Sequence, residues 1–373
     1  MKTFRPYNSL LLCIILFPAF LSAQGMMKDA RRMHRDSLIA KFNNPDTNYI
    51  KLYPDRFIVT FSQSYRQFDV NSFQTLTHDT LNLGSPKMVA DANVSSGLSI
   101  DYDKISISFG LKTYPSTPDD IRKKGKTTYK AFSFSFGYYR FRFEASYRDY
   151  HGFYDLQTPK YDTSYKHTGI YAQNPSMDVR SVRIKTFFIF NKKKFSYGAA
   201  YFDTDRQMKS AGSLLLINNV YDYLFKSDTS LIPALSRADY LQYGNLNYFR
   251  VQGISIGPGY SYNLVLWKTL YANITLTSGF DFQHRTYSTS DGSYNSSFWR
   301  VGAAADARFA IGLNGKRCFA SLTFLGDYNN YLSSGLRIEP EFKAVDFNFG
   351  YRFPFKERKW VKWMKANKIY QWL

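Results

Sequence analysis

Cysteine is almost missing from this chain. Its 373 residues contain only Cys13 and Cys318, and Cys13 lies in an N-terminal stretch with the pattern of a cleaved leader. The single remaining cysteine allows no intramolecular disulfide and no metal site of the paired-cysteine type. The strings typical of a P-loop, a dinucleotide-binding fold, a zinc site or an EF-hand are missing too. We therefore expect no cofactor and no metal.

Long apolar runs are also scarce. Beyond the leader, the most apolar stretches are Thr186–Phe190 and Leu264–Trp267, which are far shorter than the ~20 residues of a membrane-spanning helix. This excludes a helical membrane protein. A spanning β-strand of roughly 9–11 residues, in which only alternate side chains need be apolar, stays compatible with the sequence.

The leader itself indicates export. Lys2 and Arg5 precede the apolar run Leu10–Phe17, and Ser22-Ala23 offers a small-residue cleavage point before Gln24, as in a secretory signal peptide over residues 1–23. A membrane anchor is the alternative, but the apolar run is short for one. Removing residues 1–23 lowers the formal net charge from +20 to +18. So basic a chain could bind nucleic acid, but export argues against that partner.

Aromatic residues are abundant instead. The chain has 33 Phe and 31 Tyr, yet its mean hydropathy is −0.38. Many aromatics with little overall hydrophobicity suit a transmembrane β-barrel, in which half of each strand faces lipid and half faces a polar lumen.

Apolar and polar residues alternate with period two over most of the chain from about residue 93 onward. In 104–112, for example, Ile105, Ile107 and Phe109 share one face opposite serines and glycine. Such alternation predicts strands. We predict twelve: 57–69, 92–102, 104–113, 129–140, 141–153, 178–190, 195–217, 249–267, 269–287, 297–313, 317–332 and 340–355. Ten or fourteen are the alternatives, because the pattern is weakest in 92–102 and 210–217.

The connections between these strands alternate in length. Tight ones are expected at 103–104, 140, 191–194, 267–269 and 314–317, and long ones at 70–92, 114–128, 154–177, 218–248, 288–296 and 333–341. A soluble β-sandwich also alternates apolar and polar residues, but bacterial barrels in particular have short turns at one end and longer loops at the other. The sequence thus predicts an all-β fold, a closed antiparallel transmembrane β-barrel over 56–355 in the cell outer membrane.

Both ends of the chain differ from the barrel. Residues 24–55 are expected to be a periplasmic segment, with a charged, weakly amphipathic stretch at 26–45. Residues 356–373 are expected to form a basic amphipathic helix, which would lie in a membrane interface or else be a solvated tail. The residues expected at the interface are Trp360, Trp363, Lys359 and Lys362. The expected partners are outer-membrane lipids, the outer-membrane assembly machinery and a periplasmic protein.

Three short strings carry a family resemblance. They are Tyr49–Phe57, Ser210–Ser213 and Phe349–Phe353. With the leader and the strand pattern, they resemble an uncharacterised family of exported Bacteroidota proteins known as domain of unknown function 4421, over about 45–355. The resemblance implies an outer-membrane barrel and supplies no catalytic residues. The terminal helix departs from the common habit of barrels to end on an aromatic strand residue.

Catalytic candidates are few. Gly253–Gly257 has the G-x-S-x-G spacing of a nucleophile elbow, but that motif needs a strand–turn–helix context, and here it lies inside a long alternating pattern. His151 and His284 fall near the loop ends of strands, in phase with the lipid-facing residues, whereas His78 and His167 fall in loops. A lipid hydrolase with its histidine on the outer wall is one alternative function.

Charged residues in the polar phase of the strands are the stronger functional candidates. A narrow bore would bring them into ion pairs or keep them hydrated. They indicate a narrow or gated channel for small solutes, with a structural or docking barrel as the alternative. The predicted lumen-lining charges are Arg142, Glu144, Arg148, Arg183, Lys185, Asp281, Asp306, Arg308, Asp346 and Arg352.

Overall fold

The computed structural model describes residues 45–74, 85–138, 140–328, 331–333, 336–356 and 359–367. The predicted signal peptide, almost all of the stretch 26–45, and His78 lie outside these residues. Within them, no helix is long and apolar enough to cross a membrane.

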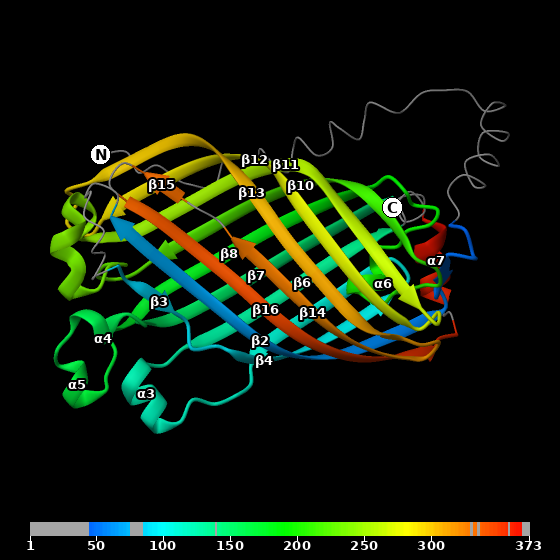
Figure 1. Ribbon diagram of the computed structural model, residues 1–373, viewed down its shortest axis with the longest axis horizontal. Coiled ribbons are helices and arrows are strands. Elements are labelled where there is room, and N and C mark those ends of the chain that lie inside the picture. Colours follow the sequence, from blue (N-terminus) through cyan, green and yellow to red (C-terminus); the bar gives the residue numbers. More distant parts are fainter. Residues whose placement is uncertain are drawn as a thin grey trace. The chain divides into compact units, whose positions relative to one another are not determined.

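Twelve strands form one closed antiparallel barrel (Figure 1), which confirms the predicted fold class and strand number. Each strand pairs with the next in the chain, and the last pairs with the first along its whole length, from Leu336 opposite Gln74 to Pro354 opposite Arg56. The strands are β2 (Arg56–Gln74), β4 (Val94–Tyr102), β5 (Ile105–Lys112), β6 (Thr128–Tyr138), β7 (Phe141–Asp155), β8 (Gln173–Ile189), β10 (Ala211–Lys226), β11 (Leu246–Leu266), β12 (Leu270–Thr289), β13 (Asn295–Asn314), β14 (Cys318–Tyr328) and β16 (Leu336–Pro354).

Strand β12 shows the polarity of a membrane barrel, with an apolar outer face and a largely polar inner face. On β12, Ile274, Leu276 and Phe280 are exposed on the outer wall, whereas Thr275 and Asp281 are buried toward the lumen. A soluble protein would place these side chains the other way round. The period-two pattern in the sequence therefore reports lipid on one face and lumen on the other.

The connections sort to opposite ends of the barrel (Figure 1). One end, here called the turn end, carries the start of β2, the end of β16 and helix α7 (Lys359–Ala366). The other, the loop end, carries the longer connections. These contain α3 (Pro118–Lys124), α4 (Thr158–Tyr161), α5 (Tyr165–Thr168), the 3-10 helix η1 (Ala234–Tyr243) and the short strand β15 (Tyr331–Ser333), which pairs with β16.

The predicted strand 195–217, the tight turn 191–194 and the loop 218–248 are wrong. The seventh barrel strand is β10, and the connection at 227–245 follows it. Residues 191–210, here called the plug, instead fold into the turn end with α6 (Gly198–Tyr201) and β9 (Asp205–Gln207), which pairs with β1 (Ile50–Leu52). Phe195 and Tyr197 alternate with polar neighbours as a strand would, but both are buried inside the barrel. Period two alone cannot tell a wall from a segment packed within it.

Several predicted loops are also shorter than expected. Strand β2 continues through the predicted loop 70–92 as far as Gln74, and β16 already begins at Leu336 within the predicted loop 333–341. The short strand β3 (Lys87–Val89) pairs with both β2 and β7, nearer the loop end than the ends of β4, β5 and β6. At this level one strand takes the place of three, so the wall has fewer strands toward the loop end.

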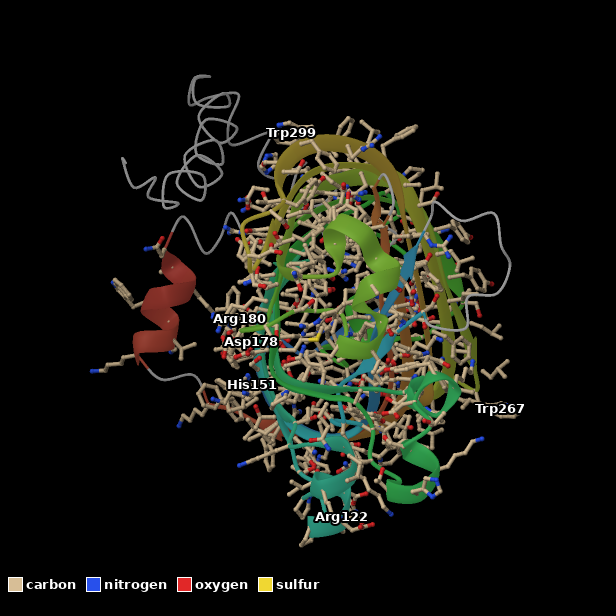
Figure 2. The ribbon with its side chains drawn as sticks, turned by 90° about the vertical axis from the view of Figure 1, so that its left-hand side faces the viewer. Arg122, His151, Asp178, Arg180, Trp267 and Trp299 are labelled. Atoms are coloured by element: carbon tan, nitrogen blue, oxygen red, sulfur yellow. The ribbon has the colours of Figure 1, made fainter. Side chains whose placement is uncertain are left out.

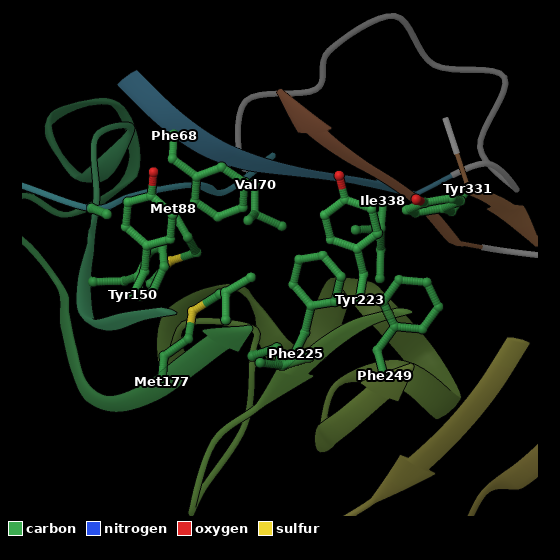
Figure 3. Packing of buried hydrophobic residues seen from close by; sticks show 14 of the residues in the cluster. Phe68, Val70, Met88, Tyr150, Met177, Tyr223, Phe225, Phe249, Tyr331 and Ile338 are labelled. Carbon is green, nitrogen blue, oxygen red and sulfur yellow. The ribbon is translucent and has the colours of Figure 1, made fainter. Parts of the chain in front are cut away.

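A large aromatic cluster fills the lumen at the loop end (Figure 3). Phe68 stacks on Tyr150 with ring centroids 4.8 Å apart, and Phe249 packs edge-on against Tyr331 at 5.8 Å. Residues from η1, including Tyr240 and Tyr243, join the cluster from the connection above β10. Seen from the loop end, many side chains lie inside the ring of strands (Figure 2).

Candidate functional site in the barrel lumen

The predicted lumen charges meet one another across the barrel. Lys185 Nζ lies 2.6 Å from Asp306 Oδ2, and Arg308 Nη1 lies 3.2 Å from Glu144 Oε2. Asp346 binds Arg66, with Nη2 and Oδ1 3.1 Å apart. Arg66 was not among the predicted residues, although its position in the polar phase of β2 could have revealed it.

The other predicted charges bind aromatic or amide groups. The guanidinium of Arg142 lies 3.5 Å from the ring centre of Phe202 in the plug, and that of Arg148 lies 3.8 Å from the ring centre of Phe342. Arg183 donates to the hydroxyl of Tyr223, and Asp281 accepts from the hydroxyl of Tyr221. Each of these charged side chains therefore contacts another side chain inside the barrel directly.

Arg352 binds the plug most extensively. Its side chain is fully buried, and its Nε and Nη2 atoms donate to the carbonyl oxygen of Asp203 at 3.1 and 2.6 Å. It also donates to Gly315 O and Asn314 Oδ1, both at 2.7 Å. Its guanidinium lies between the rings of Tyr53 and Phe319, 4.6 and 4.7 Å from their centres. One side chain thus joins the plug, the β13–β14 turn and the segment before β2.

Asparagines at the turn ends of the strands hold the rest of the plug. Asn263 Nδ2 donates to Ser196 O at 2.8 Å, and Asn314 Nδ2 donates to Asp205 O and Asp203 Oδ1, both at 3.1 Å. These amides were not predicted, because an uncharged residue in the polar phase looks like ordinary lumen lining. Their gathering at the turn ends of β11 and β13 was the available clue.

The plug carries carboxyl groups with perturbed ionisation. Burial raises the pKa of Asp203 to about 7, which the nearby Arg352 guanidinium only partly offsets. Burial also raises the pKa of Asp205, against a hydrogen bond from Ser196. A buried carboxyl without a full counter-charge favours its neutral form.

The two outward-facing histidines each have one partner. His151 Nδ1 lies 2.7 Å from Asp178 Oδ1, beside Arg180 on the outer wall (Figure 2). His284 Nε2 lies 3.0 Å from Ser297 Oγ. The first pair has an acid but no serine, and the second a serine but no acid, among the contacts of the described residues. Ser255 of the G-x-S-x-G string is buried in mid-strand, so that string is not a nucleophile elbow.

Helix α7 exposes three of the four residues expected at the membrane interface. Trp363 is 74% exposed, and Lys359 and Lys362 are exposed beside it. Val361 is buried, and Lys365 Nζ donates to Pro54 O at 3.2 Å. The side chain of Trp360 lies outside the described part.

Comparisons with known proteins identify a family and several structures of low similarity. The family model described as "Domain of unknown function (DUF4421)" matches residues 44–353, and no curated protein matches the chain. Outer membrane protease OmpT of Escherichia coli is 8% identical, with a TM-score of 0.38 and 81% of this chain and 98% of that chain covered. The toluene transporter TodX of P. putida is 8% identical, with a TM-score of 0.28 and coverages of 82% and 92%. LpxR from Salmonella typhimurium is 8% identical, with a TM-score of 0.32 and coverages of 79% and 100%. These similarities are too low to bear on what this chain does.

Proposed function

The chain belongs to the family described as domain of unknown function DUF4421, and from the geometry of its lumen we propose that it is an outer-membrane channel, closed at rest, that admits small polar solutes when the plug is released. The observation that carries this proposal is the way the plug is held. Hydrogen bonds from Arg352, Asn263 and Asn314 bind it to the wall. Polar contacts of this kind can be exchanged for contacts with water, whereas the buried Phe195 and Tyr197 of the plug oppose its release and favour the closed state.

The outer wall supports the membrane location. Exposed apolar residues on β11 run from Ile254 to Leu266, longer than the roughly 9–11 residues of a spanning strand. Beyond Ile254 the wall becomes polar, and Arg250 binds Asp222 at 2.6 Å. Exposed tryptophans flank the band, Trp267 in the β11–β12 turn and Trp299 toward the loop end (Figure 2). Aromatic residues at both interfaces are typical of outer-membrane barrels.

Conductance across planar bilayers tests the channel. We expect the wild-type protein to be silent apart from rare openings, because the plug closes the turn end and the aromatic cluster narrows the loop end. Arg352→Met removes the donors that hold the plug while keeping an unbranched side chain of similar length. This variant should open at least ten times more often, whereas Lys316→Ala in the exposed β13–β14 turn should behave as wild type. Silence of the Arg352→Met protein at all voltages would contradict the channel.

A second readout separates release of the plug from conduction. Ser108 faces the lumen on β5, and a cysteine there should react slowly with a charged thiol reagent while the plug is bound. In the Arg352→Met background the reaction should be faster. Equal rates in both backgrounds would show that Arg352 does not hold the plug closed.

A second candidate function is ester hydrolysis on the outer wall, which the 3.0 Å contact between Ser297 Oγ and His284 Nε2 favours. A histidine beside a serine can take its proton and activate it as a nucleophile. If the pair is hydrolytic, the purified protein should cleave phospholipid in mixed micelles, and both Ser297→Ala and His284→Ala should lose the activity. His151→Ala is the matched control. Unchanged background rates in all four proteins would exclude this candidate.

A further inference from the structure

A cavity of about 190 Å³ lies within the turn half of the lumen. The inward faces of β2, β4, β5 and β6 form one side of it, and Tyr201, Phe202 and Asp203 of the plug form another. Arg66, Asp346 and Asn348 complete the lining. The cavity is larger than a ~150 Å³ engineered cavity that accepts benzene, so a six-membered ring with substituents fits its volume.

The wall of the cavity consists largely of hydroxyl groups. Thr60, which is only 8% exposed, and Ser62, Ser99, Ser108 and Ser133 line it. Within the described part of the chain, no hydrogen bond joins the side-chain hydroxyls of these five residues to another protein group. Thr60 is buried and the four serines are partly buried, and buried hydroxyls generally have a partner. Several unpartnered hydroxyls facing one space are therefore placed to bind a molecule that both donates and accepts hydrogen bonds.

The charges around the cavity balance one another. Arg66 is paired with Asp346, and it also donates to Ser64 Oγ at 3.0 Å. The carboxyl of Asp101 lies within electrostatic reach of Arg142 and Arg352, and burial favours the neutral form of Asp203. An anion would meet the carboxylates of Asp101 and Asp346, and a cation would meet the guanidinium of Arg66. A neutral ligand avoids both penalties.

An aromatic ring completes the site. Phe202 of the plug lines the cavity, and the guanidinium of Arg142 lies over its ring, 3.5 Å from the ring centre. Rings of this kind pack against the C–H faces of cyclic ligands while hydroxyl groups bind the edges. The ring, the hydroxyl wall and the balanced charge together favour a ligand that is cyclic, neutral and rich in hydroxyl groups.

We propose that this cavity binds a neutral, polyhydroxylated six-membered ring, the chemistry of a monosaccharide or cyclitol. The site deepens the proposed function by naming the class of solute, and it rests on that function for the entry of the ring into the lumen. Because Phe202 and Asp203 belong to the plug, release of the plug would remove part of the site and free the ligand.

Binding to the full-length protein in detergent tests this proposal. The probes are D-glucose, D-galactose and myo-inositol, with glucose 6-phosphate and glucosamine as charged counterparts, and the measurement is saturation-transfer NMR after prolonged incubation. We expect at least one neutral ring to bind, and to bind at least ten times more tightly than its charged counterpart. Binding by none of the three, or tighter binding of a charged probe, would overturn the proposal.

A variant that fills the cavity tests whether the ring binds there. A Cβ added at Gly110 would meet Ala131 Cβ at 3.6 Å and Arg66 Nη1 at 3.7 Å, so Gly110→Val fits the wall and projects into the cavity. It should weaken binding of the ring at least tenfold. Gly326→Val, at a strand position where an added Cβ meets nothing within 4 Å, is the control and should bind as wild type. Unchanged binding in Gly110→Val would place the ligand elsewhere.

The binding site and the channel can fail separately. Binding of the ring by a protein that never conducts would support this site and exclude only the channel.

Discussion

At the scale of single residues, Arg352 shows how far the polar phase of a strand can be interpreted. Its position after Tyr351 in an alternating pattern predicts that it faces the lumen, and it is fully buried there. Its partners could not be predicted. The plug carbonyl of Asp203 and the rings of Tyr53 and Phe319 come from segments far apart in the chain. Which residues meet across a barrel depends on strand tilt and stagger, and a single sequence does not report these quantities.

Asp203 gives the plug a pH dependence. Its folded-state pKa is about 7, against about 3.9 for an unfolded aspartate. Between these two pKa values Asp203 is protonated in the folded protein and ionised in the unfolded chain. The stability of the folded protein should therefore fall as pH rises through about 7. Two charged groups act on the same carboxyl: Asp101 adds to the upward shift of its pKa, and Arg352 opposes it.

The measurement is thermal unfolding in detergent from pH 5 to 8.5. The midpoint should decline over this range, and Asp203→Asn, which keeps the shape of the side chain without its ionisation, should flatten the decline. An identical decline in both proteins would assign the pH dependence to another group.

At the scale of elements, the strands were predictable and the plug was not. The predicted strands 249–267, 269–287 and 297–313 correspond closely to β11, β12 and β13, because lipid and lumen impose period two along the whole length. The plug has the same period for a different reason. Its aromatic residues pack into the turn end, and β9 pairs with β1 rather than with the wall.

Strand β12 allows the depth of the membrane to be tested. Phe280 is 70% exposed within the apolar band, and Thr286 lies on the same face toward the loop end. A lysine near the bilayer midplane costs ~2–4 kcal/mol, and one near the interface about 0–1 kcal/mol. Phe280→Lys should therefore reduce the free energy of unfolding in lipid bilayers far more than Thr286→Lys. Phe280→Leu separates loss of the ring from gain of the charge. Equal costs for the two lysines would mean that the band is not in lipid.

At the scale of the whole molecule, closure of the barrel was predictable from an even strand number and from connections of two lengths. The orientation in the membrane follows from the same sorting and can be measured. In a Cys318→Ser background, a cysteine replacing Lys316 reports the turn end, and one replacing Ser290 reports the loop end. An impermeant thiol reagent should label the loop-end cysteine in intact cells and the turn-end cysteine only after the outer membrane is permeabilised. The reverse labelling pattern would mean that the turn end, not the loop end, faces the outside of the cell.

The pairing of β16 with β2 has a consequence for how the chain is assembled. The two strands meet over their whole length although nearly the entire barrel separates them in sequence. Contacts this remote close the largest loop in the chain and tend to form late. The backbone donors and acceptors on this edge of β2 stay unpaired until the last strand pairs with it. An open strand edge of this kind promotes aggregation. The first strand made is thus the one that needs the longest protection, so a chaperone that shields an exposed sheet edge should matter most to this barrel before its final strand is delivered.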